Sequence, residues 1–175
     1  MPTAVESGVK SGHAGSVDLF IKVTGVTQGW IKGESFDAKH KDEIDVHSYT
    51  WGVKNAIDPT TGMPVGKRRH SVLKFVARSQ SSTPGLLRAC CTNETLKSVV
   101  LTCRKAGGKQ VEYMTWTLTN ARASEVTTGY LVPDDITPYD EVSLTFQKIE
   151  LDYKPQKADG SLGAGIMFMD DWPMT

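Results

Sequence analysis

The feature that most constrains the fold of this chain is a phase change in the alternating run that begins at Val142. Val142, Leu144 and Phe146 alternate with polar residues, which is typical of a strand with one buried face. From Ile149 onward the apolar residues fall on odd numbers, so a single flat strand cannot bury both sets on one side. We therefore predict either a β-bulge near residues 147–148 or a strand that bends from one sheet into another, as in barrels and orthogonally packed sandwiches.

The rest of the chain favours a mainly β fold. Runs of strand length, separated by glycine- and proline-containing segments, occur at residues 17–23, 42–52, 72–76, 98–105, 109–120 and 123–128, and a last apolar run lies at residues 166–169. In the 42–52 run we expect Ile44 and Val46 to share a face with Ser48 and Thr50. Each face is then half apolar, which suits a strand whose ends meet different environments. We expect one domain over residues 17–175, a two-sheet antiparallel β-barrel or sandwich, after a flexible N-terminal arm at residues 1–16.

One short helix is predicted to begin at Thr83. Thr83 is a favourable N-cap, and Pro84 suits the first helical position. An apolar stripe at helical spacing follows, formed by Leu86, Leu87, Cys90 and Cys91. Because so short a helix is not stable alone, we expect it to dock this stripe on a sheet.

The cysteines and the charge balance limit the compartments and the classes of partner that suit this chain. Cys90 and Cys91 are neighbours, ~3.8 Å apart at Cα and closer than a disulfide normally spans, so we expect three buried thiols, counting Cys103. Lys+Arg and Asp+Glu both number 20, which gives no general affinity for nucleic acid and little repulsion against self-association. No apolar run predicts membrane insertion, and the N-terminus lacks a signal-peptide core. We expect synthesis in the cytoplasm, with any export by a route that reads no such signal.

No catalytic, cofactor-binding or metal-binding group emerges from the motifs. A near-match to a phosphate loop at residues 62–67 lacks the hydroxyl residue and leads into a strand. The adjacent carboxylate pairs face opposite ways on a strand and so make poor acid–base pairs. No metal-ligand spacing relates the histidines, each of which we interpret as a surface or turn residue: His13, His40, His47 and His70. We predict that the long polar segment at residues 53–67 is a loop, and a loop of this length is usually functional or an interaction arm.

Several short motifs, distributed from Val17 to Gly160, carry a family resemblance. They lie at residues 19–23, 32–35, 42–46, 49–52, 82–84, 101–108, 110–113 and 153–160, the last reading Tyr-Lys-Pro-Gln-Lys-Ala-Asp-Gly. Together they resemble the haemolysin-coregulated protein (Hcp) family, the tube-forming component of bacterial type VI secretion systems. The resemblance implies a two-sheet β-barrel flanked by a helix, which assembles into a homohexameric ring. Stacked rings would form a tube that a contractile sheath propels out of the cell beneath a valine-glycine-repeat spike protein.

The resemblance also implies roles for particular residues. The ring would carry small effectors, and Thr50, with Ser48, would face its lumen. The segment at residues 53–67 would contact the next ring, with candidate residues Val53, Lys54, Asn55, Asp58, Met63 and Lys67. The basic residues 67–70 depart from the family pattern and would make the stacking surface unusually basic. Two alternatives stay open: a phage-type tail tube subunit, and a monomeric ligand-binding or hydrolytic barrel.

Overall fold

The computed structural model of the chain describes residues 17–105, 110–130 and 137–172. The predicted N-terminal arm and residues 106–108, which join two of the predicted strands, lie outside the described residues. The elements in chain order are β1 Val17–Gly25, β2 Gly29–Ile31, β3 Ile44–Thr50, β4 Val53–Lys54, β5 Arg69–His70, β6 Leu73–Arg78, α1 Thr83–Cys91, β7 Leu96–Lys105, β8 Glu112–Gly129, β9 Tyr139–Thr145, β10 Lys148–Tyr153 and β11 Ile166–Asp171.

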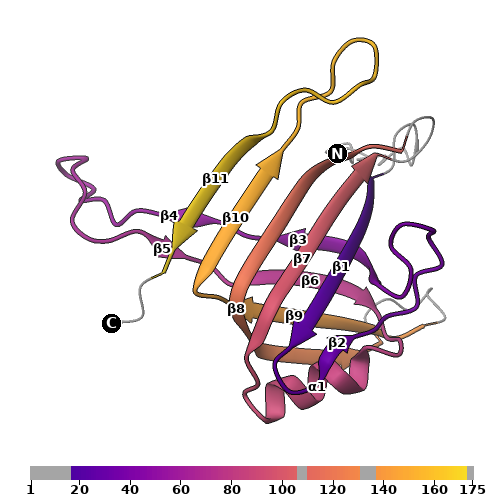
Figure 1. Cartoon of the computed structure of the whole chain (residues 1–175). Helices are drawn as coiled ribbons and strands as arrows, with labels where there is room; N and C mark the ends of the chain where they lie inside the picture. The colour runs from indigo at the N-terminus through magenta and orange to yellow at the C-terminus, as the bar shows by residue number, and fades with distance from the viewer. Residues whose placement is uncertain (1–16, 106–109, 131–136, 173–175) are drawn as a thin grey trace, which may run out of the picture.

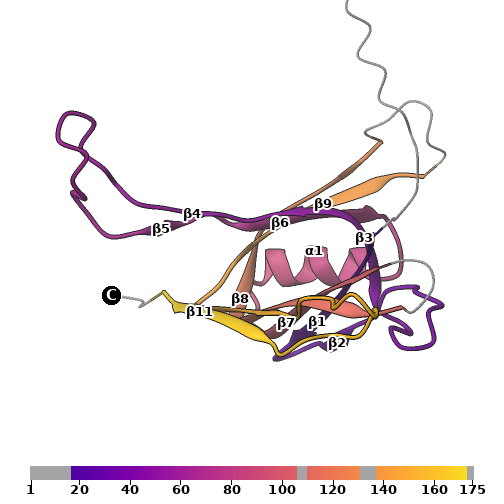
Figure 2. The ribbon, with the colours of Figure 1, turned by 90° about the horizontal axis from the view of Figure 1, so that it is seen from above.

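The strands close into an antiparallel β-barrel, which confirms the predicted fold class. They follow the order β8, β7, β1, β3, β6, β9, and β9 pairs back onto β8 to complete the circuit (Figures 1 and 2). With 18 residues, β8 is long enough to serve both layers. Its first half pairs with β7 on one edge and with β10 on the other, and β11 extends the sheet beyond β10. β10 and β11 therefore form a flap attached to the barrel.

The phase change in the sequence marks the place where a strand passes from the barrel to this flap. β9 pairs with residues 122–129 of β8, and β10 continues antiparallel to residues 114–119 of the same strand. The break between them contains Phe146, which is buried, and the next apolar residue, Ile149, is buried as well. Of the two predicted alternatives, the bend from one layer to the other is correct, because it lets both apolar sets face inward.

A bulge in β3 explains the half-apolar faces predicted for residues 42–52. The register with β6 shifts between Val46 and Ser48. Before the shift Ile44 and Val46 point into the core, and after it Tyr49 packs against the core instead. The prediction that Ser48 shares a face with Val46 is therefore wrong, since the extra residue turns Ser48 outward.

The helix closes one end of the barrel between its two layers (Figures 1 and 2). It begins at Thr83 as predicted, but Ser82 is the residue at the cap and makes no side-chain cap bond. The Thr83 hydroxyl accepts the Gln80 N–H (2.9 Å) and donates to the carboxylate of Asp140, so it ties the helix start to β9. The buried helix residues are Leu86 and Ala89.

The burial of the thiols differs from the prediction. Cys103 in β7 is buried, Cys90 is half-buried and Cys91 is exposed, and all three are free. Cys91 is exposed because the inward face of α1 is centred on Leu86 and Ala89. The core that this face joins is continuous through the barrel and consists mainly of Ile21, Val23, Ile44, Leu73, Phe75, Leu96, Leu101, Leu118, Val142, Leu144 and Ile149. None of the helices in the described residues is long and apolar enough to cross a bilayer.

Candidate assembly surfaces

Between β3 and β6 the chain leaves the barrel as a long projecting arm, residues 53–70 (Figures 1 and 2). The sequence predicted a loop, and the structure shows a hairpin-like arm in which β4 pairs with β5 and Ile57 bridges to Pro64. Asp58 organises the tip: its carboxylate accepts the N–H groups of Thr60 (2.7 Å) and Thr61 (3.1 Å). These backbone hydrogen bonds lower the pKa of Asp58. Local hydrogen bonds therefore shape the tip of the arm.

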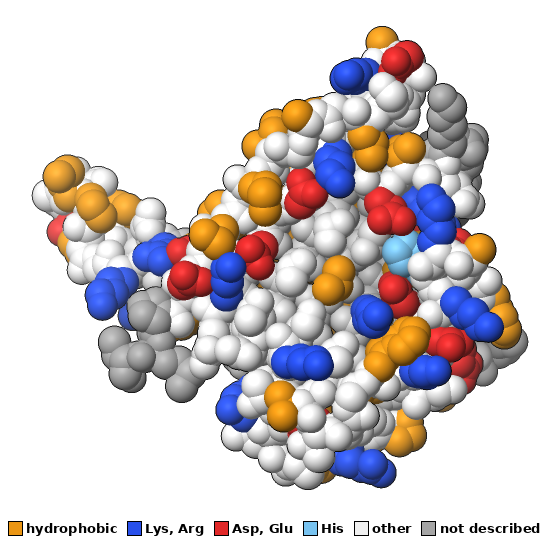
Figure 3. Space-filling view, in the orientation of Figure 1, with side chains coloured by type: hydrophobic (Ala, Val, Ile, Leu, Met, Phe, Trp, Pro, Cys, Tyr) orange, Lys and Arg blue, Asp and Glu red, His pale blue; other side chains and the backbone are white. Residues whose placement is uncertain are grey.

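The predicted contact residues lie along this arm. Asp58 is half-buried in the turn, and the other five side chains are exposed: Val53, Lys54, Asn55, Met63 and Lys67. Two further exposed apolar side chains accompany them, Ile57 and Val65. Figure 3 shows the apolar side chains gathered at the tip of the arm. Exposed apolar patches of this kind are typical of surfaces that contact another protein.

The base of the arm is fixed to β11 by an ion-pair cluster. Both Nε and Nη2 of Arg68 donate to the carboxylate of Asp170, and His70 Nε2 lies 2.9 Å from the same carboxylate. The Arg68 hydrogen bonds lower the pKa of Asp170. The His70 ring also stacks on Trp51 at 5.6 Å. Because Arg68 is neutralised in this way, the arm is less basic than its sequence suggests.

The histidine prediction is correct for two of the described residues and wrong for one. His47 is exposed, and His40 lies in a turn, where its carbonyl accepts the N–H of Glu43 (3.1 Å), although its side chain is only 8% exposed. His70 lies in β5, and its side chain is 2% exposed. His13 lies outside the described residues. In the described part of the chain no three His, Cys, Asp or Glu side chains are grouped so that they could hold a metal ion.

β11 presents an apolar surface that the sequence analysis did not single out as a site. Among the described residues β11 pairs only with β10, so its other edge carries unpaired backbone groups. Four consecutive side chains cover both of its faces and are 40–69% exposed: Ile166, Met167, Phe168 and Met169. Figure 3 shows apolar side chains along this side of the molecule. The apolar run was visible in the sequence, but its place on a flap outside the closed barrel was not.

The two candidate lumen residues lie together on a polar sheet face. Ser48 and Thr50 are exposed on β3, where they oppose Val76 and Lys74 of β6. The Lys74 ammonium lies 2.7 Å from the carboxylate of Glu141 on β9, and the neighbouring exposed residues on β8 are also polar. This face therefore differs in character from the apolar surface of β11.

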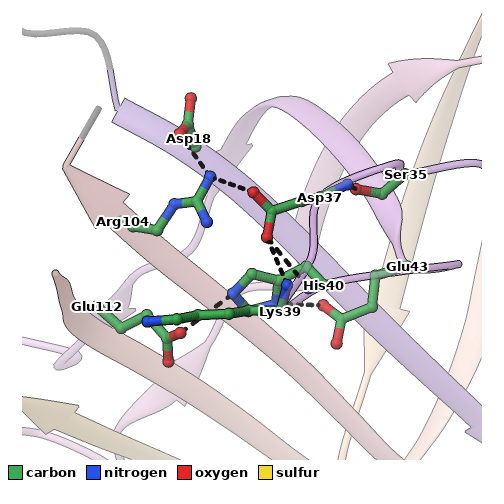
Figure 4. Close-up of polar contacts among 8 residues, drawn as sticks. All are labelled: Asp18, Ser35, Asp37, Lys39, His40, Glu43, Arg104 and Glu112. Atoms are coloured by element: carbon green, nitrogen blue, oxygen red, sulfur yellow. Dashed lines mark hydrogen bonds and ion pairs between the residues drawn. The ribbon is translucent and has the colours of Figure 1, made fainter. Parts of the chain in front are cut away.

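A buried charge network fixes the loop of residues 33–43 (Figure 4). Arg104 of β7 is 3% exposed, and its Nη2 contacts Asp18 (3.0 Å) and Asp37 (2.7 Å). The Phe20 ring lies between the Arg104 guanidinium (4.8 Å) and the His40 ring (4.2 Å). The hydrogen bond from Arg104 is the main reason that the pKa of Asp37 falls to about 2.

His40 completes this network from the loop side. Its Nδ1 lies 2.9 Å from the carboxylate of Glu43, and its Nε2 lies 3.3 Å from the carboxylate of Glu112. The participating residues come from β1, the loop, β7 and β8, which are far apart in the sequence. No local pattern could have predicted that they meet.

Comparisons with known proteins agree with this geometry. Residues 20–153 match the family model described as "Type VI secretion system effector, Hcp". Protein hcp1 of Pseudomonas aeruginosa is 39% identical over 153 residues, which cover 86% of this chain and 91% of that protein. The "Major exported protein" of the same organism is 25% identical over 169 residues, covering 87% of this chain and 94% of that protein.

Solved structures give the same result. A crystal structure of an Hcp protein superimposes with a TM-score of 0.78 at 25% identity and covers 89% of this chain and 99% of its own. A type VI secretion system effector from Yersinia pestis superimposes with a TM-score of 0.70 at 29% identity, covering 89% of this chain and 100% of its own. The resemblance inferred from the short motifs is thus confirmed, and the chain belongs to the Hcp family of type VI secretion proteins.

Proposed function

We propose that this chain is the structural subunit of a type VI secretion tube. Six copies form a ring, rings stack into a tube, and a contractile sheath propels the tube out of the cell beneath a valine-glycine-repeat spike. The role is structural rather than catalytic, and it requires no cofactor, nucleic acid or membrane insertion. The name "Major exported protein" of one relative supports export, and the family match favours this function over that of a phage-type tail tube.

The observation that carries the proposal is the apolar flap strand β11. Natural proteins blunt or cover exposed sheet edges, because an apolar edge strand otherwise pairs with other chains. Here Ile166, Met167, Phe168 and Met169 are all exposed next to an edge that pairs with no other strand of the described residues. A second copy seated on this surface would remove the apolar area from water. An interface of ordinary size would bury about 800 Å² per partner, and a head-to-tail interface whose rotation closes produces a ring.

Charges placed on this strand test the proposal. We expect Met167→Lys combined with Met169→Lys to convert the native assembly into monomers, because two charges would have to be buried in the interface. Both side chains are exposed, so the folded barrel should retain its stability within roughly 0.5 kcal/mol for each substitution. Analytical ultracentrifugation and thermal unfolding measure the two effects. The matched control is Val26→Lys, which places a charge on an exposed apolar residue in the β1–β2 turn, away from β11.

The polar face of β3, β6 and β9 suits a water-filled lumen that holds small effectors. In this proposal Thr50 contacts cargo and Ser48 lies beside it. We expect Thr50→Arg to leave rings intact, because Thr50 is exposed and outside the apolar flap. The bulky charge should reduce the amount of effector that co-purifies with the rings. Unchanged cargo in the variant would exclude Thr50 from the lumen contact surface.

A further inference from the structure

Phe36 is a fully exposed aromatic side chain on a loop that is otherwise fixed. Its exposed fraction is 99%. The residues on either side of it are held: Ser35 exchanges backbone hydrogen bonds with residues 42 and 43 (both 3.0 Å), and Asp37 contacts Arg104 at 2.7 Å. Large apolar side chains held in place and surrounded by water are typical of anchors that insert into a partner. The loop therefore presents Phe36 in advance of binding.

A cavity of suitable size lies at the other end of the same strands. It has a volume of about 280 Å³ and sits where the arm returns to β6 and where β9 bends into β10. Val72, Phe146 and Trp172 supply its apolar lining, and polar groups of residues such as Asn120 and Arg122 complete it. A cavity of roughly 150 Å³ is already large enough to hold benzene, so a phenyl ring fits here.

The Phe36 side chain and the cavity lie at opposite ends of the barrel wall. The loop of residues 33–43 leads into Ile44 at the start of β3, whereas the far end of β3 leads into the arm (Figures 1 and 2). The seven residues of β3 separate them by about 20 Å. One copy cannot fill its own cavity across this distance. When a chain has a projecting side chain at one end and a matching cavity at the other, successive copies can associate head to tail.

We propose that Phe36 of one copy inserts into this cavity of a copy in the next ring, beside the base of that copy's arm. This contact rests on the proposed tube function and deepens it. It requires the arm and the cavity to lie on one face of the ring and the loop of residues 33–43 to lie on the opposite face. Charge supports the pairing: Glu34 lies two residues before Phe36, and Arg122 lines the cavity. The partner is therefore a second copy of this chain.

Cysteine cross-linking in assembled tubes tests the contact. Phe36→Cys and Val72→Cys are combined in a Cys91→Ser background, because Cys91 is the exposed native thiol. Oxidation of tubes recovered from cells that assemble the apparatus should give a ladder of cross-linked copies on a non-reducing gel. Each single cysteine variant should give none. Isolated rings of the double variant should also give none, since the contact joins different rings.

A second set of variants measures how much the Phe36 contact contributes to the association of rings. Removal of one buried phenyl ring should weaken ring-to-ring association roughly tenfold to a hundredfold per contact. We therefore expect Phe36→Ala to form normal rings by mass while tubes become short and export falls. Phe36→Leu should restore both. Val26→Ala, which removes exposed apolar surface elsewhere on the molecule, should change neither.

The outcomes separate this contact from the proposed function. A ladder that appears in isolated rings and stops at six copies would place the contact within a ring and overturn the inference. Tubes of normal length from Phe36→Ala, or tubes without cross-links in the double variant, would overturn it as well. If the wild-type chain forms no rings or tubes at all, the proposed function itself fails, and the inference fails with it.

Discussion

At the scale of single residues, the best-defined feature of this chain is a buried charge cluster that stabilises the fold. Arg104 is buried, and Asp18 and Asp37 balance its charge while Phe20 packs against it. The sequence could not predict this cluster, because charged residues in separate segments show no common pattern. The same reason explains why the burial of the His40 and His70 side chains was not predicted, since their neighbours come from distant parts of the chain.

The low pKa of Asp37 makes a prediction about pH. A carboxyl whose pKa is lower in the folded state stabilises the fold above the unfolded pKa, and this stabilisation is lost as pH falls through the folded pKa of about 2. We expect Asp37→Asn to lower the melting temperature by several degrees at pH 7. The difference from wild type should shrink below pH ~4 and nearly vanish by pH ~2. Thermal unfolding across this range measures it, and a difference independent of pH would contradict the assignment.

At the scale of elements, the alternation of apolar residues predicted most of the strands and the break after Phe146. It did not predict which strands pair, because the register depends on partners that are distant in the sequence. The bulge after Val46 shows the limit well: the half-apolar faces were visible, but the extra residue that reconciles them was not. The arm was predicted as a loop because β4 and β5 are too short to show alternation.

The anchor between the arm and β11 makes a prediction at this scale. Asp170 holds both Arg68 and His70 at the base of the arm. We expect Asp170→Asn to increase tryptic cleavage at the nearby Lys67, Arg68 and Arg69 several-fold, because proteolysis requires local opening. Limited digestion followed by mass spectrometry measures the rates. Asp171→Asn is the control, because it makes the same change in the exposed side chain next to Asp170. Equal cleavage in both variants would mean that the anchor does not hold the arm.

At the scale of the whole molecule, the fold class and the family followed from the sequence, whereas the exposed apolar surface of β11 did not. The motifs from Leu19 to Gly160 were sufficient for the family, and the family model match confirms it. The apolar run at residues 166–169 was visible as well. Its exposure could be recognised only once β8 was seen to close the barrel and to leave β10 and β11 as a flap outside it.

The mass of the native particle tests the central claim of self-assembly most directly. One chain has a mass of 19.1 kDa. Native mass spectrometry or sedimentation of the purified protein should give six times this value, with the apolar β11 surface covered by neighbouring copies. A particle with the mass of a single chain, unchanged across protein concentrations and buffers, would contradict the account.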